Sequence, residues 1–203
     1  MKLHHTLAGN GPRVLFFNGS GATLESAAPI VDNLRTFATV LAHDQRGLGR
    51  TGIIDGPFTM AQYARDGADL LDHIGWDRCV VVGVSFGGMV AQEFAVTFPE
   101  RLEKLVLLCT SAGGEAGMSY PLHDNIELSP EQRVTRMRTV YDTRFTDEFL
   151  AADKFSAAIA KMLADREFVA KPDEVRRGEE LQLEARRHHD VASRLGNITC
   201  PTL

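Results

Sequence analysis

The sequence predicts an α/β protein in which helices cover both faces of a mostly parallel sheet. Along the first half of the chain, short apolar runs rich in β-branched residues alternate with longer stretches of helical periodicity. This alternation is typical of consecutive strand–helix–strand units. The 203 residues are 44% hydrophobic, which is enough to bury the core of one domain and leaves room for an inserted subdomain.

The first predicted strands lie before residue 43. A weak strand over 2–7 and a turn at 9–11 precede a clear buried strand over 14–17. A helix over 24–34 follows, and the next strand covers 39–42. The strand predicted over 14–17 is entirely apolar and the one over 39–42 is apolar after Thr39, as expected of strands buried on both faces.

Two more helices and two more strands complete this half. The first helix is predicted from Thr59, a suitable N-cap, to Ile74, with Gly75 as its stop. A buried strand over 80–82 leads into the second helix, which ends at Phe98 before a proline. The apolar run 105–108 is the last strand of this series.

The composition changes after these strands. Residues 111–121 are rich in Gly, Ser and Ala and predict a linker, whereas 130–195 are charged and helical in pattern, without a buried-strand run. We interpret the charged region as a helical cap over the sheet's carboxyl edge. The expected domains are a core over 1–113, a cap over 114–195 and the start of a post-cap core strand over 196–203.

The junction after the 80–82 strand carries the most informative motif. Gly83-Val84-Ser85-Phe86-Gly87 matches G-x-S-x-G between a strand and a helix, the context of a nucleophile elbow. A non-glycine residue in so tight a turn is strained by roughly 1–3 kcal/mol, and close neighbours must lack a Cβ. Gly83 and Gly87 meet that demand. The turn would expose the Ser85 hydroxyl and aim the Phe86 N–H at a developing oxyanion. A Gly-rich turn with an incidental serine is the alternative.

Charge and composition exclude several other classes of function. The net charge of −5 and the lack of a basic run argue against a nucleic-acid partner. No segment approaches the roughly 20 apolar residues of a membrane span, and the N-terminus lacks a signal peptide, so a cytoplasmic protein is expected. Three cysteines in or beside apolar runs indicate buried free thiols. No H-E-x-x-H, C-x-x-C or Walker lysine occurs, so neither a metal nor a cofactor is expected.

Three further segments carry recognisable patterns. Residues 17–21 read Phe-Asn-Gly-Ser-Gly after a strand, residues 44–51 match D-x-R-G-x-G-x-S/T, and residues 98–107 read P-E-R-L-E-K-L-V-L after an initial Phe. Together with the elbow, they resemble the α/β-hydrolase fold family, close to its esterases, enol-lactonases and proline-iminopeptidase-like enzymes. The resemblance covers most of the chain.

The resemblance implies a cofactor-independent serine hydrolase that acts on a small-molecule ester, lactone or related carbonyl. Ser85 would be the nucleophile, and the backbone N–H groups of Phe86 and Ser20 would form the oxyanion hole. Asn18 stands where the family usually has a histidine. The 44–51 loop is structural support in this family.

The same loop offers a weaker alternative. Residues 47–52 satisfy G-x-G-x-x-G after a strand, and Asp66 and Asp69 lie at a suitable distance for a ribose ligand. A dinucleotide site would require these glycines to open a helix directly. The intervening segment 53–58, with Gly56-Pro57 inside it, argues against that geometry.

The resemblance also implies an acid and a histidine that follow the nucleophile in chain order. We expect both beyond Leu203, because His123, His188 and His189 are better explained as pocket-lining or helix-end residues. The chain is therefore expected to be the amino-terminal part of a hydrolase. It should be nearly inactive as a fragment, since loss of the base lowers turnover by on the order of 10⁶. A non-catalytic binding protein that retains the fold is the alternative.

Overall fold

The computed structural model describes residues 2–52, 56–115, 117 and 119–203. It contains two compact units. Residues Met1–Ser119 and Asp173–Leu203 form one, which we call the sheet unit, and Tyr120–Pro172 form the other, which we call the helical unit. The predicted cap, 114–195, extends beyond the helical unit at both ends.

The sheet unit contains a five-stranded sheet in the order β1-β3-β2-β4-β5. β1 pairs with β3 in antiparallel fashion, whereas the β3–β2, β2–β4 and β4–β5 pairs are parallel. The prediction of a mostly parallel sheet is therefore confirmed. The strands are β1 His5–Ala8, β2 Arg13–Phe17, β3 Thr39–His43, β4 Cys79–Val84 and β5 Leu102–Leu108.

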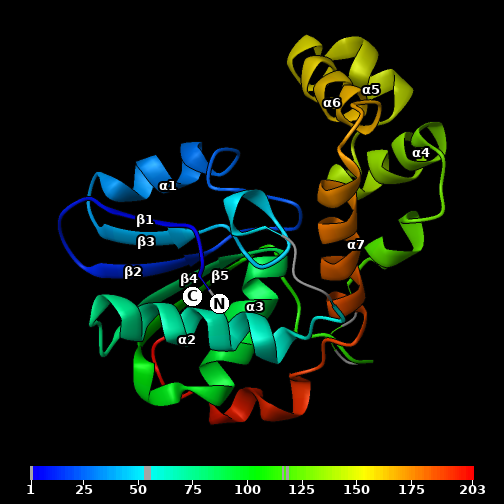
Figure 1. The fold of residues 1–203 in the computed structure, drawn as a ribbon. Helices are drawn as coiled ribbons and strands as arrows, with labels where there is room; N and C mark the ends of the chain where they lie inside the picture. Colours follow the sequence, from blue (N-terminus) through cyan, green and yellow to red (C-terminus); the bar gives the residue numbers. More distant parts are fainter. Residues whose placement is uncertain (1, 53–55, 116, 118) are drawn as a thin grey trace. The chain divides into compact units, whose positions relative to one another are not determined.

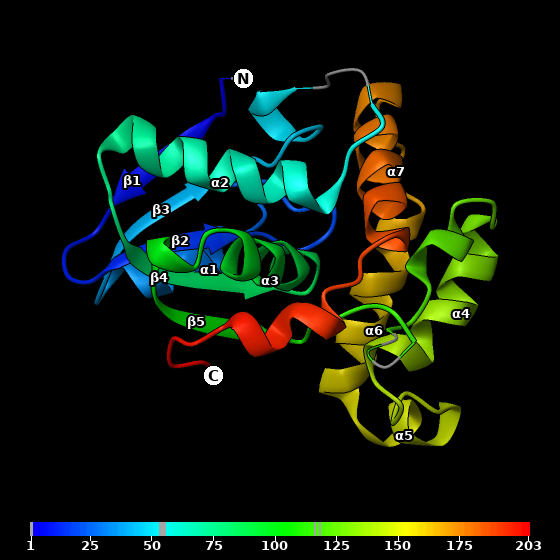
Figure 2. The ribbon, with the colours of Figure 1, turned by 90° about the horizontal axis from the view of Figure 1, so that it is seen from below.

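Helices cover both faces of this sheet, as predicted. α1 (Ala28–Arg35) lies on one face, and α2 (Met60–Ile74) and α3 (Phe86–Thr97) lie on the other (Figures 1 and 2). Alternate residues of the strands supply the two cores: Phe16 packs in the cluster that contains α1, and Leu15 packs in the cluster that contains α2 and α3. Such alternation follows from the two-residue repeat of a strand.

The ends of α2 follow the sequence prediction closely. The Thr59 hydroxyl accepts a hydrogen bond from Gln62 N–H, and the Gln62 side chain accepts one from Thr59 N–H, which makes a capping box. Gly75 ends the helix in the left-handed region, at φ 70°. No described helix has the length and apolar character needed to span a bilayer.

Three boundaries differ from those predicted. α1 begins at Ala28 instead of residue 24, because Leu24 N–H is bound by Asp44 Oδ1 at 2.7 Å and the chain turns before the helix starts. α3 begins at Phe86, directly after the elbow serine, whereas the sequence pattern predicts a helix from Met89. β5 begins at Leu102 instead of Leu105. Short 3₁₀ helices at Gly49–Thr51 and Pro99–Arg101 connect these elements.

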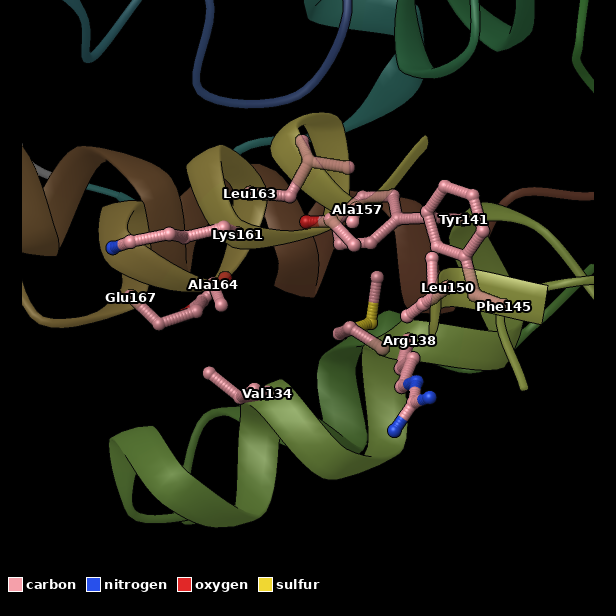
Figure 3. A pocket seen from close by; sticks show the side chains of 12 residues that line it. Val134, Arg138, Tyr141, Phe145, Leu150, Ala157, Lys161, Leu163, Ala164 and Glu167 are labelled. Carbon is pink, nitrogen blue, oxygen red and sulfur yellow. The ribbon is translucent and has the colours of Figure 1, made fainter. Parts of the chain in front are cut away.

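The helical unit consists of a 3₁₀ turn and three helices. They are η3 Leu122–Asn125, α4 Pro130–Tyr141, α5 Asp147–Ala152 and α6 Lys154–Glu167. Each α-helix begins at a side-chain N-cap, supplied by Ser129, Thr146 and Asp153. A cavity of about 250 Å³ lies among them, and Tyr141, Phe145 and Leu150 gather on one side of it (Figure 3).

The last part of the chain belongs to the sheet unit. α7 (Asp173–Arg187) is followed by a 3₁₀ helix, η4 (Ala192–Asn197). Residues 201–203 then pair in parallel with the outer edge of β5: Leu105 N–H donates to Pro201 O at 3.0 Å, and Leu203 N–H donates to Leu105 O at 3.0 Å.

Candidate active site

Ser85 occupies a strained turn between β4 and α3. Its backbone angles are φ 53° and ψ −114°, a region that costs a non-glycine residue about 1–3 kcal/mol. A Cβ built on Gly83 would lie 2.3 Å from the carbonyl oxygen of Gly87, and one on Gly87 would lie 2.1 Å from that of Phe17. Both positions therefore need glycine.

The strained turn is held from the neighbouring strand. Ser85 N–H donates to Leu108 O at 2.8 Å, and the Thr110 hydroxyl donates to Ser85 O at 2.8 Å. A Cβ on Gly88 would lie 2.5 Å from the Thr110 side chain. Thr110 was not anticipated from the sequence; the available signal was a hydroxyl residue directly after the strand beside the elbow.

The Phe86 N–H and the loop that contains Gly19 and Ser20 adjoin the serine. Phe86 N–H stands at the first turn of α3, where the carbonyl of Ser85 already accepts from Gly88 and Met89. Gly19 lies beside the serine, since a Cβ built on it would be 3.8 Å from Ser85 Cβ. Among the described residues, neither Ser20 N–H nor Phe86 N–H has a hydrogen-bond acceptor.

Asn18 fixes the start of the loop that contains Ser20. Its side chain is buried, and its Nδ2 donates to the carbonyl of His43 at 3.1 Å. Gln45 Nε2 donates to the carbonyl of Asn18 at 2.7 Å. Because both bonds join the ends of β2 and β3, the residue that replaces the family's usual histidine here ties two loops together.

The 44–51 loop is organised around one buried carboxylate. Asp44 Oδ1 accepts from Leu24 N–H at 2.7 Å, and Oδ2 accepts from Arg50 N–H at 2.9 Å. His4 Nδ1 lies 3.0 Å from the same Oδ2. A Cβ on Gly49 would lie 2.4 Å from the Asp44 carboxyl. These contacts support the structural role that the resemblance implies for this loop.

The geometry after this loop differs from that of a dinucleotide site. Gly49–Thr51 form only a three-residue 3₁₀ helix, and α2 does not begin until Met60; residues 53–55 lie outside the described part. Asp66, the candidate ribose ligand, already binds Arg46 through two hydrogen bonds of 2.7 Å. Burial raises the pKa of Asp66, and the Arg46 guanidinium opposes that rise. No metal-binding cluster of His, Cys, Asp or Glu occurs within the described ranges.

The three later histidines lie in different surroundings. His123 belongs to the helical unit, and His188 is exposed at the end of α7. His189 is buried against the backbone of Gly113 in the sheet unit, and burial lowers its pKa. Among the described residues of the sheet unit, none forms a hydrogen bond with Ser85 Oγ.

Comparison with known proteins places this geometry in context. A family model described as the alpha/beta hydrolase fold matches residues 12–186. A poly(3-hydroxyalkanoate) depolymerase of Ectopseudomonas oleovorans is 40% identical over 100 residues, which are 49% of this chain and 35% of that protein. The 3-oxoadipate enol-lactonase 2 of Acinetobacter baylyi is 29% identical over 140 residues, which are 68% of this chain and 52% of that protein.

Among solved structures, a hydrolase from Pseudomonas aeruginosa superposes with a TM-score of 0.71 at 26% identity. That match covers 98% of this chain and 73% of the other. The chain thus spans about a third of the depolymerase and about half of the enol-lactonase that it matches in sequence.

Proposed function

The chain belongs to the alpha/beta hydrolase fold family, and on this premise we propose that it carries the nucleophile and oxyanion-binding half of a cofactor-independent serine hydrolase. Its relatives include an enol-lactonase and a poly(3-hydroxyalkanoate) depolymerase. Both names indicate substrates that contain a carbonyl group. We propose a small-molecule ester, lactone or related carbonyl as the substrate, with Ser85 as the nucleophile.

The backbone of Ser85 is the observation that carries this proposal. A serine held at φ 53° between β4 and α3 is a costly arrangement that an ordinary strand-to-helix turn does not need. The two glycines around it allow the close backbone contacts that this turn requires. Such strain is typical of functional sites, because it presents a side chain in a fixed position.

The proposed reaction follows from these groups. Ser85 Oγ attacks the carbonyl carbon of the substrate while its proton passes to a base. The carbonyl oxygen becomes an oxyanion that accepts hydrogen bonds from Phe86 N–H and Ser20 N–H. Collapse of this intermediate expels the alcohol, which takes up the proton, and water then releases the acid from the acyl-serine.

Turnover by this chain should be slow. No described residue of the sheet unit forms a hydrogen bond with Ser85 Oγ, and loss of the base in a serine triad costs on the order of 10⁶ in turnover. Reaction with a strongly activated reagent requires less help from a base. Single-turnover labelling is therefore a more suitable test than steady-state hydrolysis.

The test is covalent labelling with a reactive fluorophosphonate, with the site identified by peptide mass spectrometry. We expect modification at Ser85 that Ser85→Ala abolishes and that added imidazole, as an external base, accelerates. Ser193→Ala is the matched control, because it removes an exposed serine hydroxyl in η4, at a residue to which the proposal gives no role.

Two outcomes would contradict the proposal. Equal labelling of the unaltered chain and Ser85→Ala would show that another residue reacts. No labelling of a folded chain at any imidazole concentration would favour the alternative, a binding protein that keeps the fold without the chemistry.

A further inference from the structure

A buried glutamine of α7 holds the loop that contains Ser20. Gln182 Oε1 accepts a hydrogen bond from Gly21 N–H at 2.8 Å, and the Gln182 side chain is fully buried. The two residues are 161 positions apart in the chain. A side chain so remote in sequence therefore determines the orientation of a peptide unit next to the proposed oxyanion donor.

Close backbone contacts hold α7 in the position that this bond requires. A Cβ built on Gly178 would lie 1.8 Å from the carbonyl oxygen of Gly47, so the helix and the 44–51 loop touch where neither residue has a side chain. A Cβ on Gly56 would lie 2.4 Å from the Leu181 side chain. Gln182, one turn beyond Gly178, is thereby fixed relative to the loops at the sheet's carboxyl edge.

The loop has further anchors on either side of Gly21. The Asn18 carbonyl accepts from Gln45 Nε2, and Leu24 N–H donates to Asp44 Oδ1, each at 2.7 Å. The central part of the loop lies between these anchors, and Gly21 there has a positive φ of 66°. Among the described residues, the bond to Gln182 is the one side-chain hydrogen bond to the backbone of residues 19–21.

This bond also settles which donors are available. Gly21 N–H is occupied by Gln182, whereas Ser20 N–H has no acceptor among the described residues. In a trans peptide the C=O and N–H point in opposite directions, so holding Gly21 N–H keeps the Ser20 carbonyl turned away from Gln182. The Ser20 N–H belongs to the preceding peptide unit, which is joined to this one at the Ser20 Cα. A shift of the Gly21 anchor would therefore displace Ser20 together with its N–H.

We propose that Gln182 is a positioning residue, which fixes the Ser20–Gly21 peptide so that Ser20 N–H is presented to the oxyanion formed at Ser85. This inference rests on the proposed function, since it assigns the loop a part in the same reaction. Gln182 Nε2 has no hydrogen-bond partner among the described residues. The Gln182 side chain therefore acts through its Oε1 acceptor.

The test compares three substitutions on α7. Gln182→Met keeps the length of the side chain and removes the acceptor, and Gln182→Glu restores an acceptor oxygen. Arg177→Met places the same new side chain at an exposed position of the same helix. Gln182→Asn, which withdraws the amide by one carbon, serves as a second disruptive variant if Gln182→Met does not fold.

The first measurement is hydrogen exchange at individual amides by NMR. We expect Gly21 N–H to exchange at least about tenfold faster in Gln182→Met, and at the original rate in Gln182→Glu and Arg177→Met. Val31 N–H, which donates to Ala27 O at 3.0 Å in α1, is the internal reference and should not change. Equal protection of Gly21 in all variants would overturn the proposal.

The second measurement is the rate of Ser85 modification as a function of fluorophosphonate concentration. We expect Gln182→Met to lower the maximal rate by about tenfold without changing the half-saturating concentration, because a displaced donor weakens the transition state more than the encounter complex. Gln182→Glu should restore the rate. Faster exchange at Gly21 with unchanged labelling would reduce the bond to a structural contact and overturn the assignment. Absence of labelling in the unaltered chain would instead refute the proposed function, and the exchange data would still report on the contact itself.

Discussion

The sheet unit and the helical unit are stabilised in different ways. In the sheet unit, glycines let one backbone touch another, as at Gly87 against Phe17, and the inner strands β2, β3 and β4 are almost continuously buried. In the helical unit, only Asn125, Met137 and Phe145 are buried among its described residues. Side-chain caps and ion pairs stabilise its helices, and the cavity among them is lined mostly by apolar side chains.

The difference shows where positional accuracy is required. A backbone-to-backbone contact tolerates almost no displacement, because adding a single carbon creates a clash. Contacts between long charged side chains adjust by rotation at little cost. The unit that holds Ser85 is therefore the one whose geometry a single methyl group can disrupt.

The largest effect is expected at the elbow. Gly87→Ala would place a carbon 2.1 Å from Phe17 O and 2.5 Å from Asn18 O, so β2 or α3 must move at a cost of about 3 kcal/mol or more. Gly196→Ala, with no atom within 4 Å of the new carbon, is the control. Urea unfolding measures the free energy of unfolding of both variants. Equal values would show that the sheet unit adjusts to an added methyl group as readily as the helical unit does.

The second effect is a pH dependence confined to the sheet unit. Burial lowers the pKa of His43 from 6.5 to about 4. Between pH 6.5 and pH 4, His43 is therefore protonated in the unfolded chain and neutral in the folded chain. The contribution of His43 to the free energy of unfolding should be constant above pH 6.5, fall by about 3 kcal/mol as the pH drops toward 4, and then level off.

His43→Leu, which cannot titrate, isolates this contribution. The difference between the two pH profiles of unfolding free energy should be constant above pH 6.5 and change by about 3 kcal/mol between pH 6.5 and 4. A constant difference across pH 7 to 4 would mean that His43 accepts its proton while folded.

A third, smaller effect concerns the cavity of the helical unit. Ala164, which lines it (Figure 3), can be enlarged without meeting a packed backbone, so Ala164→Leu should stabilise by about 0.5–1 kcal/mol. Ala152→Leu, at an exposed site of α5, controls for helix propensity. Slower hydrogen exchange in α4 and α6 is the expected readout, and a loss of stability would indicate that this unit is as tightly packed as the sheet unit.

The smallest effect is the ion pair between α4 and α6. Arg133 Nε lies 2.8 Å from Glu167 Oε2, with both side chains about a quarter exposed. A double-mutant cycle with Arg133→Met and Glu167→Gln should give a coupling of about 0.5 kcal/mol that decreases in high salt. The more exposed pair Lys161–Asp165 should give less. A coupling that salt does not change would point to packing instead of charge.

The sequence was sufficient wherever a local pattern has a local cause. The N-cap at Thr59 and the stop at Gly75 act on neighbours within a few residues, and both are found where expected. The fold class followed from the alternation of apolar runs and helical stretches, and the family from four short motifs.

The sequence was insufficient for contacts between remote segments. Nothing near Gln182 indicates that it binds Gly21, and the position of Thr110 directly after a strand does not by itself indicate a bond to Ser85. A more specific signal was available at Gly178, which lies inside a helix, where glycine costs about 1 kcal/mol and often marks a close approach. This close approach to Gly47 explains why α7 belongs to the sheet unit. Its charged helical sequence pattern is the same as that of the helices before it.

The two hydrogen bonds that hold the Ser85 backbone restrict the residue type at their partner positions to different degrees. Leu108 contributes only its carbonyl oxygen to Ser85 N–H, so any residue with a backbone can stand there. Thr110 contributes a hydroxyl, so substitution there is restricted to Ser or Thr. Many residue types should therefore be found at position 108 among homologues, and only Ser or Thr at position 110. A deep mutational scan would measure this contrast directly.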